Sequence, residues 1–179
     1  REIWGENWVF AHNGNLKNLP DMSNYFLQPI GSTDSEAAFC YLAEYLKNTY
    51  RQKPSEMEIF EAIQKVTKKL AQHGTFNFIL SNGEWMIANC STNLHYLMRK
   101  APFGKAHRID DDGVIDFSDY AKEGDKVNII TTFPLTKDET WTKMENGGFV
   151  FFKNGDKIAE VIGTPKAAID DGTLGNRTI

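Results

Sequence analysis

The chain has few of the residues that build disulfide frameworks or metal centres. Its two cysteines, Cys40 and Cys90, are far apart in the sequence and suggest neither a disulfide framework nor a metal cluster. The acidic run 110–112 lacks the remaining ligands of a calcium loop. The histidines are dispersed with no pair at the spacing of metal ligands, at His12, His73, His95 and His107. We therefore expect no metal and no cofactor.

Long hydrophobic runs and an excess of positive charge are also missing. No apolar stretch approaches the roughly 20 residues that span a bilayer, and the first residues do not resemble a signal peptide. The net charge of -4 gives no general attraction to nucleic acid. We therefore expect a cytoplasmic protein that binds neither membranes nor nucleic acid. Hydrophobic residues make up 41% of the chain, which is enough to build one core in a single domain.

The most informative segment is Ala11–Leu16, with the sequence Ala-His-Asn-Gly-Asn-Leu. The preceding residues, Trp8–Ala11, favour a short buried strand that stops at the Asn-Gly dipeptide. Such an end brings a backbone N–H and a side-chain amide to the rim of a sheet, where two donors can stabilise the oxyanion of acyl transfer. Asn13 and Gly14 are therefore candidate oxyanion-hole residues. Alternatively, the dipeptide forms a tight hairpin turn, although residues 15–24 resemble a loop rather than a second strand.

A second segment, Gly31–Glu36, has the pattern of a helix start. Thr33 suits the N-cap and Glu36 follows three residues later, which predicts a capping box. Asp34 is left in the first turn, where the helix dipole favours a carboxylate whether or not a ligand binds it. A functional role for Asp34 therefore requires a cationic partner.

The two segments together resemble the class-II glutamine amidotransferases, which are N-terminal-nucleophile hydrolases. In that family the Asn and Gly of a His-Asn-Gly motif form the oxyanion hole, which assigns this role to Asn13 and Gly14. The Asp of a Thr-Asp-Ser-Glu motif holds the α-ammonium group of glutamine, which assigns substrate binding to Asp34. The resemblance extends from Arg1 to about residue 160. Further segments of the sequence are similar to the stand-alone bacterial members of the family, at residues 74–78, 90–94, 101–104, 132–136 and 139–141.

The family's nucleophile is a cysteine at the mature N-terminus, and the sequence here begins with Arg1-Glu2-Ile3-Trp4. The resemblance also implies an upstream arginine for the substrate's α-carboxylate. We therefore expect that the N-terminal piece of the domain is missing, that the nucleophile lies upstream, and that residues 1–179 alone neither fold independently nor catalyse the reaction. Cys40 and Cys90 are alternative nucleophiles, but both positions favour buried structural thiols.

The sequence predicts an α+β fold. Ser55 and Glu58 form a capping box before a helical apolar pattern that ends by Gly74, and the turn 81–83 joins two strands in a hairpin. Further strands are expected at 94–99, 127–132, 148–153 and 157–161. Helices between groups of antiparallel strands indicate that they cover one face of a sheet. The family resemblance implies a four-layer αββα sandwich, with residues 1–162 as the amidotransferase domain and residues 163–179 as a tail.

Three functions follow from these patterns. The first is a glutamine amidotransferase or glutaminase that hydrolyses the side-chain amide of glutamine or a related γ-glutamyl compound, with a separate protein as a possible ammonia acceptor. The second is a catalytically inactive glutamine-binding or regulatory module that keeps Asp34. The third is a cysteine hydrolase that uses Cys40 or Cys90. Within the first function, His12 is expected to orient the oxyanion loop or to be a satisfied buried histidine.

Overall fold

The computed structural model describes residues 1–164, and residues 165–179 lie outside the described part. Its helices are α1 (Asp34–Thr49) and α2 (Glu56–Leu70), with short 3₁₀ turns η1 (Ala71–His73) and η2 (Ser118–Tyr120). The strands are β1 (Glu2–Ile3), β2 (Glu6–Asn7), β3 (Val9–Leu16), β4 (Gly74–Ser81), β5 (Trp85–Cys90), β6 (Leu94–Lys100), β7 (Lys105–His107), β8 (Val114–Asp116), β9 (Lys126–Thr131), β10 (Thr142–Met144), β11 (Gly148–Lys153) and β12 (Asp156–Val161).

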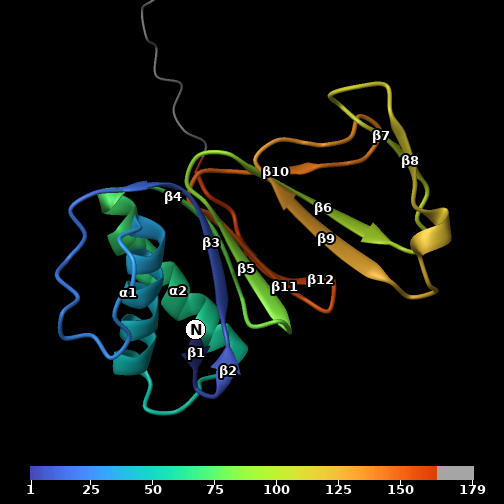
Figure 1. The fold of residues 1–179 in the computed structure, drawn as a ribbon. Helices are drawn as coiled ribbons and strands as arrows, with labels where there is room; N and C mark the ends of the chain where they lie inside the picture. Colours follow the sequence, from blue (N-terminus) through green and yellow to red (C-terminus); the bar gives the residue numbers. More distant parts are fainter. Residues whose placement is uncertain (165–179) are drawn as a thin grey trace, which may run out of the picture.

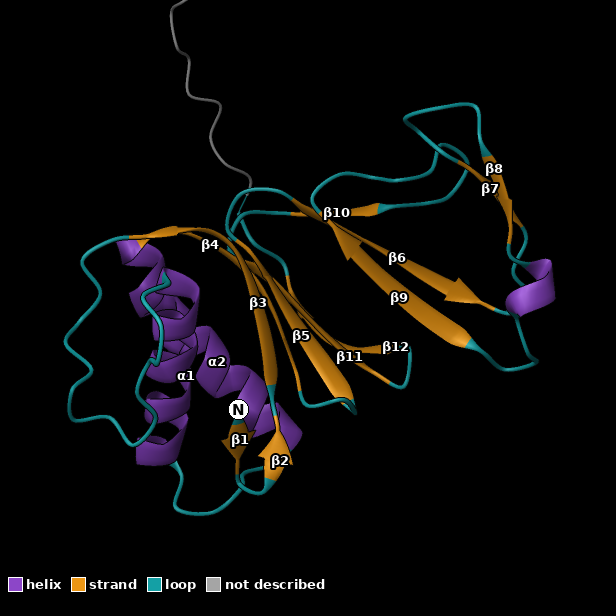
Figure 2. Cartoon of the chain, in the orientation of Figure 1, coloured by secondary structure: helices purple, strands orange, loops and turns teal. Residues whose placement is uncertain are grey.

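A five-stranded antiparallel sheet forms the centre of the fold, in the order β12-β11-β5-β4-β3. Successive side chains of a strand point to opposite faces of a sheet. On one face, Phe76, Phe78 and Leu80 of β4 join the core that α1 and α2 complete. Figure 1 and Figure 2 show both helices on this face. The apolar stripes of the two helices therefore create a helix layer over the sheet.

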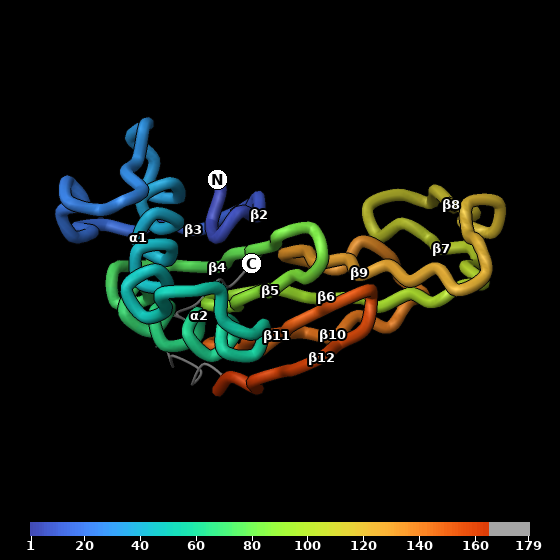
Figure 3. The backbone as a smooth tube through the Cα atoms, turned by 90° about the horizontal axis from the view of Figure 1, so that it is seen from below, coloured from blue at the N-terminus to red at the C-terminus, as the bar shows by residue number. Residues whose placement is uncertain are grey.

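A second sheet, in the order β10-β6-β9, packs on the other face. The residues between the sheets are apolar, with Ala88 and Val150 of the large sheet contacting the cluster that contains Leu94 and Tyr96 of β6. The hairpin of β7 and β8 lies at the end of the molecule remote from α1 (Figure 3). Residues 1–164 thus form a mixed fold with one helix layer and two sheet layers.

Both predicted helix starts are confirmed, but their caps differ. The hydroxyl of Ser55 accepts a hydrogen bond from the N–H of Glu58, and the Glu58 carboxylate accepts one from the N–H of Ser55, which completes the capping box. The hydroxyl of Thr33 accepts from the N–H of Glu36 at 3.2 Å. The Glu36 carboxylate instead accepts from the N–H groups of Ile30 and Gly31, so only half of the expected box forms.

The prediction that the first strand stops at Asn13-Gly14 is wrong, and so is the alternative hairpin turn. β3 continues to Leu16, and both residues are paired with β4, at Asn77 and Phe76. The long partner strand β4 supplies a continuous ladder, which outweighs the local turn preference of Asn-Gly. The other predicted hairpins and strands are confirmed. The short strands β7, β8 and β10 lack a predictive pattern in the sequence. The predicted tail falls mainly on residues outside the described part.

Candidate active site

The candidate site is built on β3, which is an edge strand of the five-stranded sheet. At the start of the strand, the N–H of Trp8 donates to the carbonyl of Arg1 at 2.7 Å, on the side away from β4. At its end, the N–H of Leu16 donates to Asp34 Oδ2 at 2.8 Å. N–H groups of alternate residues point to the same edge of a strand. The N–H of Gly14, two residues before Leu16, is therefore directed to this outer edge.

Gly14 is held where any side chain would collide with its surroundings. A Cβ atom at this position would lie 2.0 Å from the carbonyl oxygen of Thr75 and 2.6 Å from Nε2 of His12. The first contact is with backbone, which cannot move without breaking the register of β3 and β4. The sequence requirement for glycine here therefore comes from close packing rather than from a turn conformation.

His12 joins β3 to both neighbouring elements. Its side chain is only 1% exposed. Nε2 lies 3.0 Å from the carbonyl oxygen of Thr75 and Nδ1 lies 3.0 Å from Oγ of Ser35. A carbonyl can only accept, so Nε2 carries a proton and donates to Thr75, while Nδ1 shares a hydrogen bond with the Ser35 hydroxyl. His12 is thus a satisfied buried histidine beneath Gly14, which agrees with one of the two expectations from sequence.

Asp34 is the first residue of α1 and lies beside the same outer edge of β3. Its side chain is 31% exposed, and its Oδ2 lies 4.0 Å from Nδ1 of His12. The bond from the Leu16 N–H fixes one carboxylate oxygen, while the remaining exposure leaves access for a cation. The structure therefore brings Asp34 close to the strand that carries the candidate oxyanion donors.

The side chain of Asn13 faces the second sheet, because it is one residue out of phase with His12. There it lines a cavity of about 180 Å³, whose other walls include Asn77, Leu94, Ile130 and Thr132. Asp34 is not among the residues that line this cavity. Gly14 and Asp34 are thus brought to one edge, while the Asn13 amide lies on the adjoining face. Ser35, Thr75 and Asn77 hold this arrangement; all three lie in segments that resemble the family, but the sequence assigns no role to any of them.

Arg1 lies beside the N-terminal end of α1. Its guanidinium group forms a salt bridge with Glu36. The backbone N–H groups of Ile30 and Gly31, together with Arg1, hold the pKa of the Glu36 carboxyl below its ordinary value. The loop before α1 is therefore tied to both its own helix and the start of the chain.

The two cysteines are buried, Cys40 in α1 and Cys90 at the end of β5. Burial raises the pKa of both thiols above the ordinary value. A raised pKa lowers the thiolate population, and the lack of exposure blocks a substrate. These positions support the interpretation of both residues as structural thiols.

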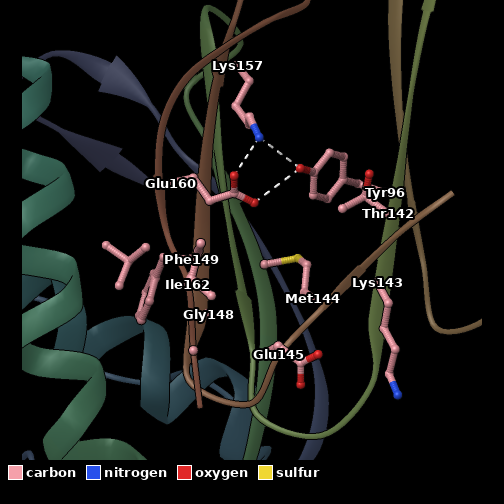
Figure 4. A pocket seen from close by; sticks show the side chains of 12 residues that line it. Tyr96, Thr142, Lys143, Met144, Glu145, Gly148, Phe149, Lys157, Glu160 and Ile162 are labelled. Carbon is pink, nitrogen blue, oxygen red and sulfur yellow. Dashed lines mark hydrogen bonds and ion pairs between the residues drawn. The ribbon is translucent and has the colours of Figure 1, made fainter. Parts of the chain in front are cut away.

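Two larger cavities lie away from β3. One of about 370 Å³ is lined by β10, β11 and β12, and contains the hydrogen-bonded set of Tyr96, Lys157 and Glu160 (Figure 4). Tyr96 donates to Glu160 and accepts from Lys157, so the polar groups satisfy one another. The other, of about 440 Å³, lies in the second sheet beside Phe117 and Trp141. Neither cavity includes the candidate residues of β3.

Comparison with known proteins decides the family. The sequence model described as class-II glutamine amidotransferases matches residues 1–171. The chain belongs to this family. The chain is 91% identical to a Haemophilus influenzae protein named "Putative glutamine amidotransferase", over 100% of the chain and 61% of that relative. It is 43% identical to the Escherichia coli "Putative glutamine amidotransferase YafJ", over 88% of the chain and 62% of the relative.

A solved structure supports the same relationship. It is described as a "predicted glutamine amidotransferase" from Pseudomonas aeruginosa PA01, with a TM-score of 0.79 and 35% sequence identity. The match covers 89% of the present chain and 62% of that chain. The chain thus spans less than two thirds of the length of these relatives. Among residues 1–164, no helix has the length and apolar character needed to cross a membrane, and no cluster of three potential metal ligands occurs.

Proposed function

We propose that the full-length protein hydrolyses the side-chain amide of glutamine, or of a related γ-glutamyl compound, at the outer edge of β3. The observation that carries this proposal is the convergence of the Gly14 N–H and the Asp34 carboxylate on that edge. The substrate's α-ammonium group pairs with Asp34. Its γ-carbonyl oxygen then accepts from Gly14 and from the amide of Asn13, where the edge meets the face of the second sheet.

The proposed nucleophile is a cysteine at the mature N-terminus, in a segment that precedes Arg1 in the full-length protein. Arg1 and Trp8 exchange two backbone hydrogen bonds, which is the pattern of an antiparallel pair. A preceding segment that continued this pairing would run along the outer edge of β3 toward Gly14. It would thereby bring its side chains to the proposed oxyanion donors and cover the exposed edge.

The chemistry of such a residue needs no additional base. A free α-amino group, with an unperturbed pKa of about 7.7 to 8.0, accepts the proton of the thiol. The sulfur then attacks the γ-carbon, and Asn13 and Gly14 stabilise the resulting oxyanion. The C–N bond breaks as the nitrogen takes up the proton, which gives ammonia and a γ-glutamyl thioester. Water cleaves the thioester to glutamate and restores the thiol.

The same proposal extends to the organisation of the protein. Residues 1–162 form the amidotransferase domain of a four-layer αββα sandwich, and the three layers of residues 1–164 are compatible with that architecture. We further propose that the protein acts in the cytoplasm and that ammonia passes to a separate acceptor or is released.

Covalent labelling of the full-length protein tests the proposal. A glutamine-like diazoketone should alkylate one cysteine upstream of Arg1, and mass spectrometry of the digested protein should locate the adduct there. Excess glutamine should prevent the labelling. An adduct on Cys40 or Cys90 would indicate a different cysteine hydrolase. Glutamine binding without any labelling or turnover would indicate an inactive binding module.

A further inference from the structure

Asn77 is a buried polar residue that lies opposite Asn13 in the β3–β4 pair. Its side chain is nearly inaccessible, since the residue is 5% exposed. The amide nitrogen donates to the carbonyl oxygen of Asn13 at 3.1 Å and to Oγ1 of Thr92 at 2.8 Å. The amide oxygen accepts from the N–H groups of Ser91 and Thr92, at 2.9 and 3.1 Å. All four hydrogen-bonding positions of the Asn77 side chain are therefore used.

The contact with Asn13 acts on the peptide group that matters for catalysis. The carbonyl of Asn13 and the N–H of Gly14 belong to the same planar unit, and in a trans peptide they point in opposite directions. A donor that holds the carbonyl toward β4 therefore holds the N–H toward the outer edge. Two sets of hydrogen bonds thus fix the direction of the Gly14 N–H: those between the backbones of β3 and β4, and the one from the side chain of Asn77.

We propose that Asn77 is a positioning residue that aims the Gly14 N–H at the oxyanion by holding the Asn13 carbonyl. The inference rests on the proposed amide hydrolysis and deepens it. Asn77 touches neither substrate nor nucleophile in this scheme, and it acts only through the Asn13–Gly14 peptide.

The same side chain ties the peptide to the second sheet. Ser91 and Thr92 lie in the turn between β5 and β6, and the next residue, Asn93, donates to the carbonyl of Thr132 at 2.6 Å. Thr132 lines the cavity beside Asn13. Asn77 therefore couples the orientation of the oxyanion donor to a turn that binds Thr132, which lines this cavity.

The variant Asn77→Asp in the full-length protein separates positioning from folding. It keeps the size of the side chain and the acceptor for the N–H groups of Ser91 and Thr92, but it replaces the nitrogen that donates to the Asn13 carbonyl and the Thr92 hydroxyl with an oxygen. We expect kcat for glutamine hydrolysis to fall about 10- to 100-fold with KM changed by less than about twofold, because the donor acts in the transition state. Asn82→Asp is the matched control, since Asn82 is in the turn at the far end of β4 and bonds Glu84, Trp85 and Glu6.

A second readout probes the donors of the proposed oxyanion hole. Glutamate γ-semialdehyde forms a hemithioacetal when the thiol adds to its carbonyl and the thiol proton moves to the oxygen. Its affinity should fall in Asn77→Asp by about the same factor as kcat, whereas a loss of folded protein would lower the active fraction and leave the affinity unchanged. In the wild-type protein, a crystal structure of this adduct should place its oxygen within hydrogen-bond distance of the Gly14 nitrogen. This measurement does not depend on whether a variant folds.

The outcomes distinguish this inference from the proposed function. If the wild-type enzyme is active and Asn77→Asp has an unchanged kcat, the positioning role alone is overturned. The same conclusion follows if the adduct oxygen binds away from Gly14. A wild-type protein that neither hydrolyses γ-glutamyl amides nor reacts with the aldehyde overturns both. Reduced kcat and aldehyde affinity in Asn77→Asp, with normal values in Asn82→Asp, support both.

Discussion

Asn13 and Gly14 are neighbours in the chain, but they present their donors in different directions. The Gly14 N–H is directed along the sheet toward the outer edge, and the Asn13 side chain leaves the sheet toward the second layer. An oxygen that accepts from both must lie beside the edge, on the side of the sheet that faces β6 and β9. This requirement limits where the scissile amide can bind more narrowly than the motif alone.

The variant Asn13→Ala tests the side-chain donor. We expect kcat to fall about 100- to 1,000-fold, because one of two donors to the developing oxyanion is lost. The KM for glutamine should change little, since Asp34, which holds the α-ammonium group in the proposed mechanism, is unchanged. Steady-state kinetics of the full-length protein measure both values. Turnover equal to that of the wild type would exclude Asn13 from the oxyanion hole.

At the scale of elements, the caps explain why the helices begin where they do. Ser55 and Glu58 satisfy each other's backbone N–H groups before the apolar stripe of α2 begins. The hydroxyl and the backbone N–H of Ser55 both donate to the Glu58 carboxylate and hold its pKa below the ordinary value, with the hydroxyl as the main cause. The first turn of α2 is thus defined by local interactions that can be read from the sequence.

The variant Ser55→Ala should lower the free energy of unfolding by about 1 kcal/mol, because the first turn loses its side-chain acceptor. Thermal or urea unfolding of the full-length protein measures the change. Ser118→Ala provides a comparison, since that hydroxyl bonds Asp116 at the start of a 3₁₀ turn and caps no α-helix. An equal loss in both variants would contradict the importance of the cap.

The elements differ in how well the sequence predicts them. Both helices have caps and apolar stripes, and β4 and β5 alternate around an intact Asn-Gly turn, so local rules suffice. β3 is different because its Asn-Gly dipeptide is paired with a strand that begins about sixty residues later. No local sequence pattern predicts which distant strand will pair with β3. The motif residues of the site were identified through the family resemblance. The resemblance also covers Ser35 and Asn77, but the contacts of these two residues became visible only when the chain was folded.

At the scale of the whole molecule, the second sheet has its own partly buried ion pair. Arg99 donates to both carboxylate oxygens of Glu139, at 2.5 and 2.6 Å, and Thr136 donates to the same carboxylate at 2.7 Å. The hydrogen bonds from Arg99 are the main cause that lowers the pKa of Glu139. This pair joins β6 to the loop before β10, in a part of the fold that lies away from the candidate site.

Replacing Glu139 should therefore change stability and leave the chemistry intact. We expect Glu139→Gln to lower the free energy of unfolding at pH 7 by about 1 to 3 kcal/mol, because Arg99 loses its charged acceptor. The lowered pKa means that the wild type gains this stability above the ordinary carboxyl pKa of about 4.3, and loses it as the pH falls further.

Urea unfolding at several pH values measures this dependence. The difference between wild type and Glu139→Gln should begin to shrink below about pH 4, where the carboxyl of the unfolded chain takes up its proton, and should vanish once the pH falls through the lowered pKa of the folded protein. Glu123→Gln is the control for an exposed carboxylate. A large fall in glutamine turnover in Glu139→Gln, at a pH where the protein is folded, would show that the second sheet contributes to the site.

The side chains of β3 alternate strictly between the two faces of the sheet. The number of residues in this strand therefore affects the geometry of the site more than the identity of most of its residues does. One residue inserted between Trp8 and Asn13 would turn the asparagine amide toward α1 and the histidine toward the second sheet. The glycine N–H would then face β4 and be unable to reach a ligand. Substitution at Val9, which is 64% exposed, leaves this phase unchanged. A mutational scan should therefore tolerate many replacements at the exposed positions of β3 and almost no insertions or deletions.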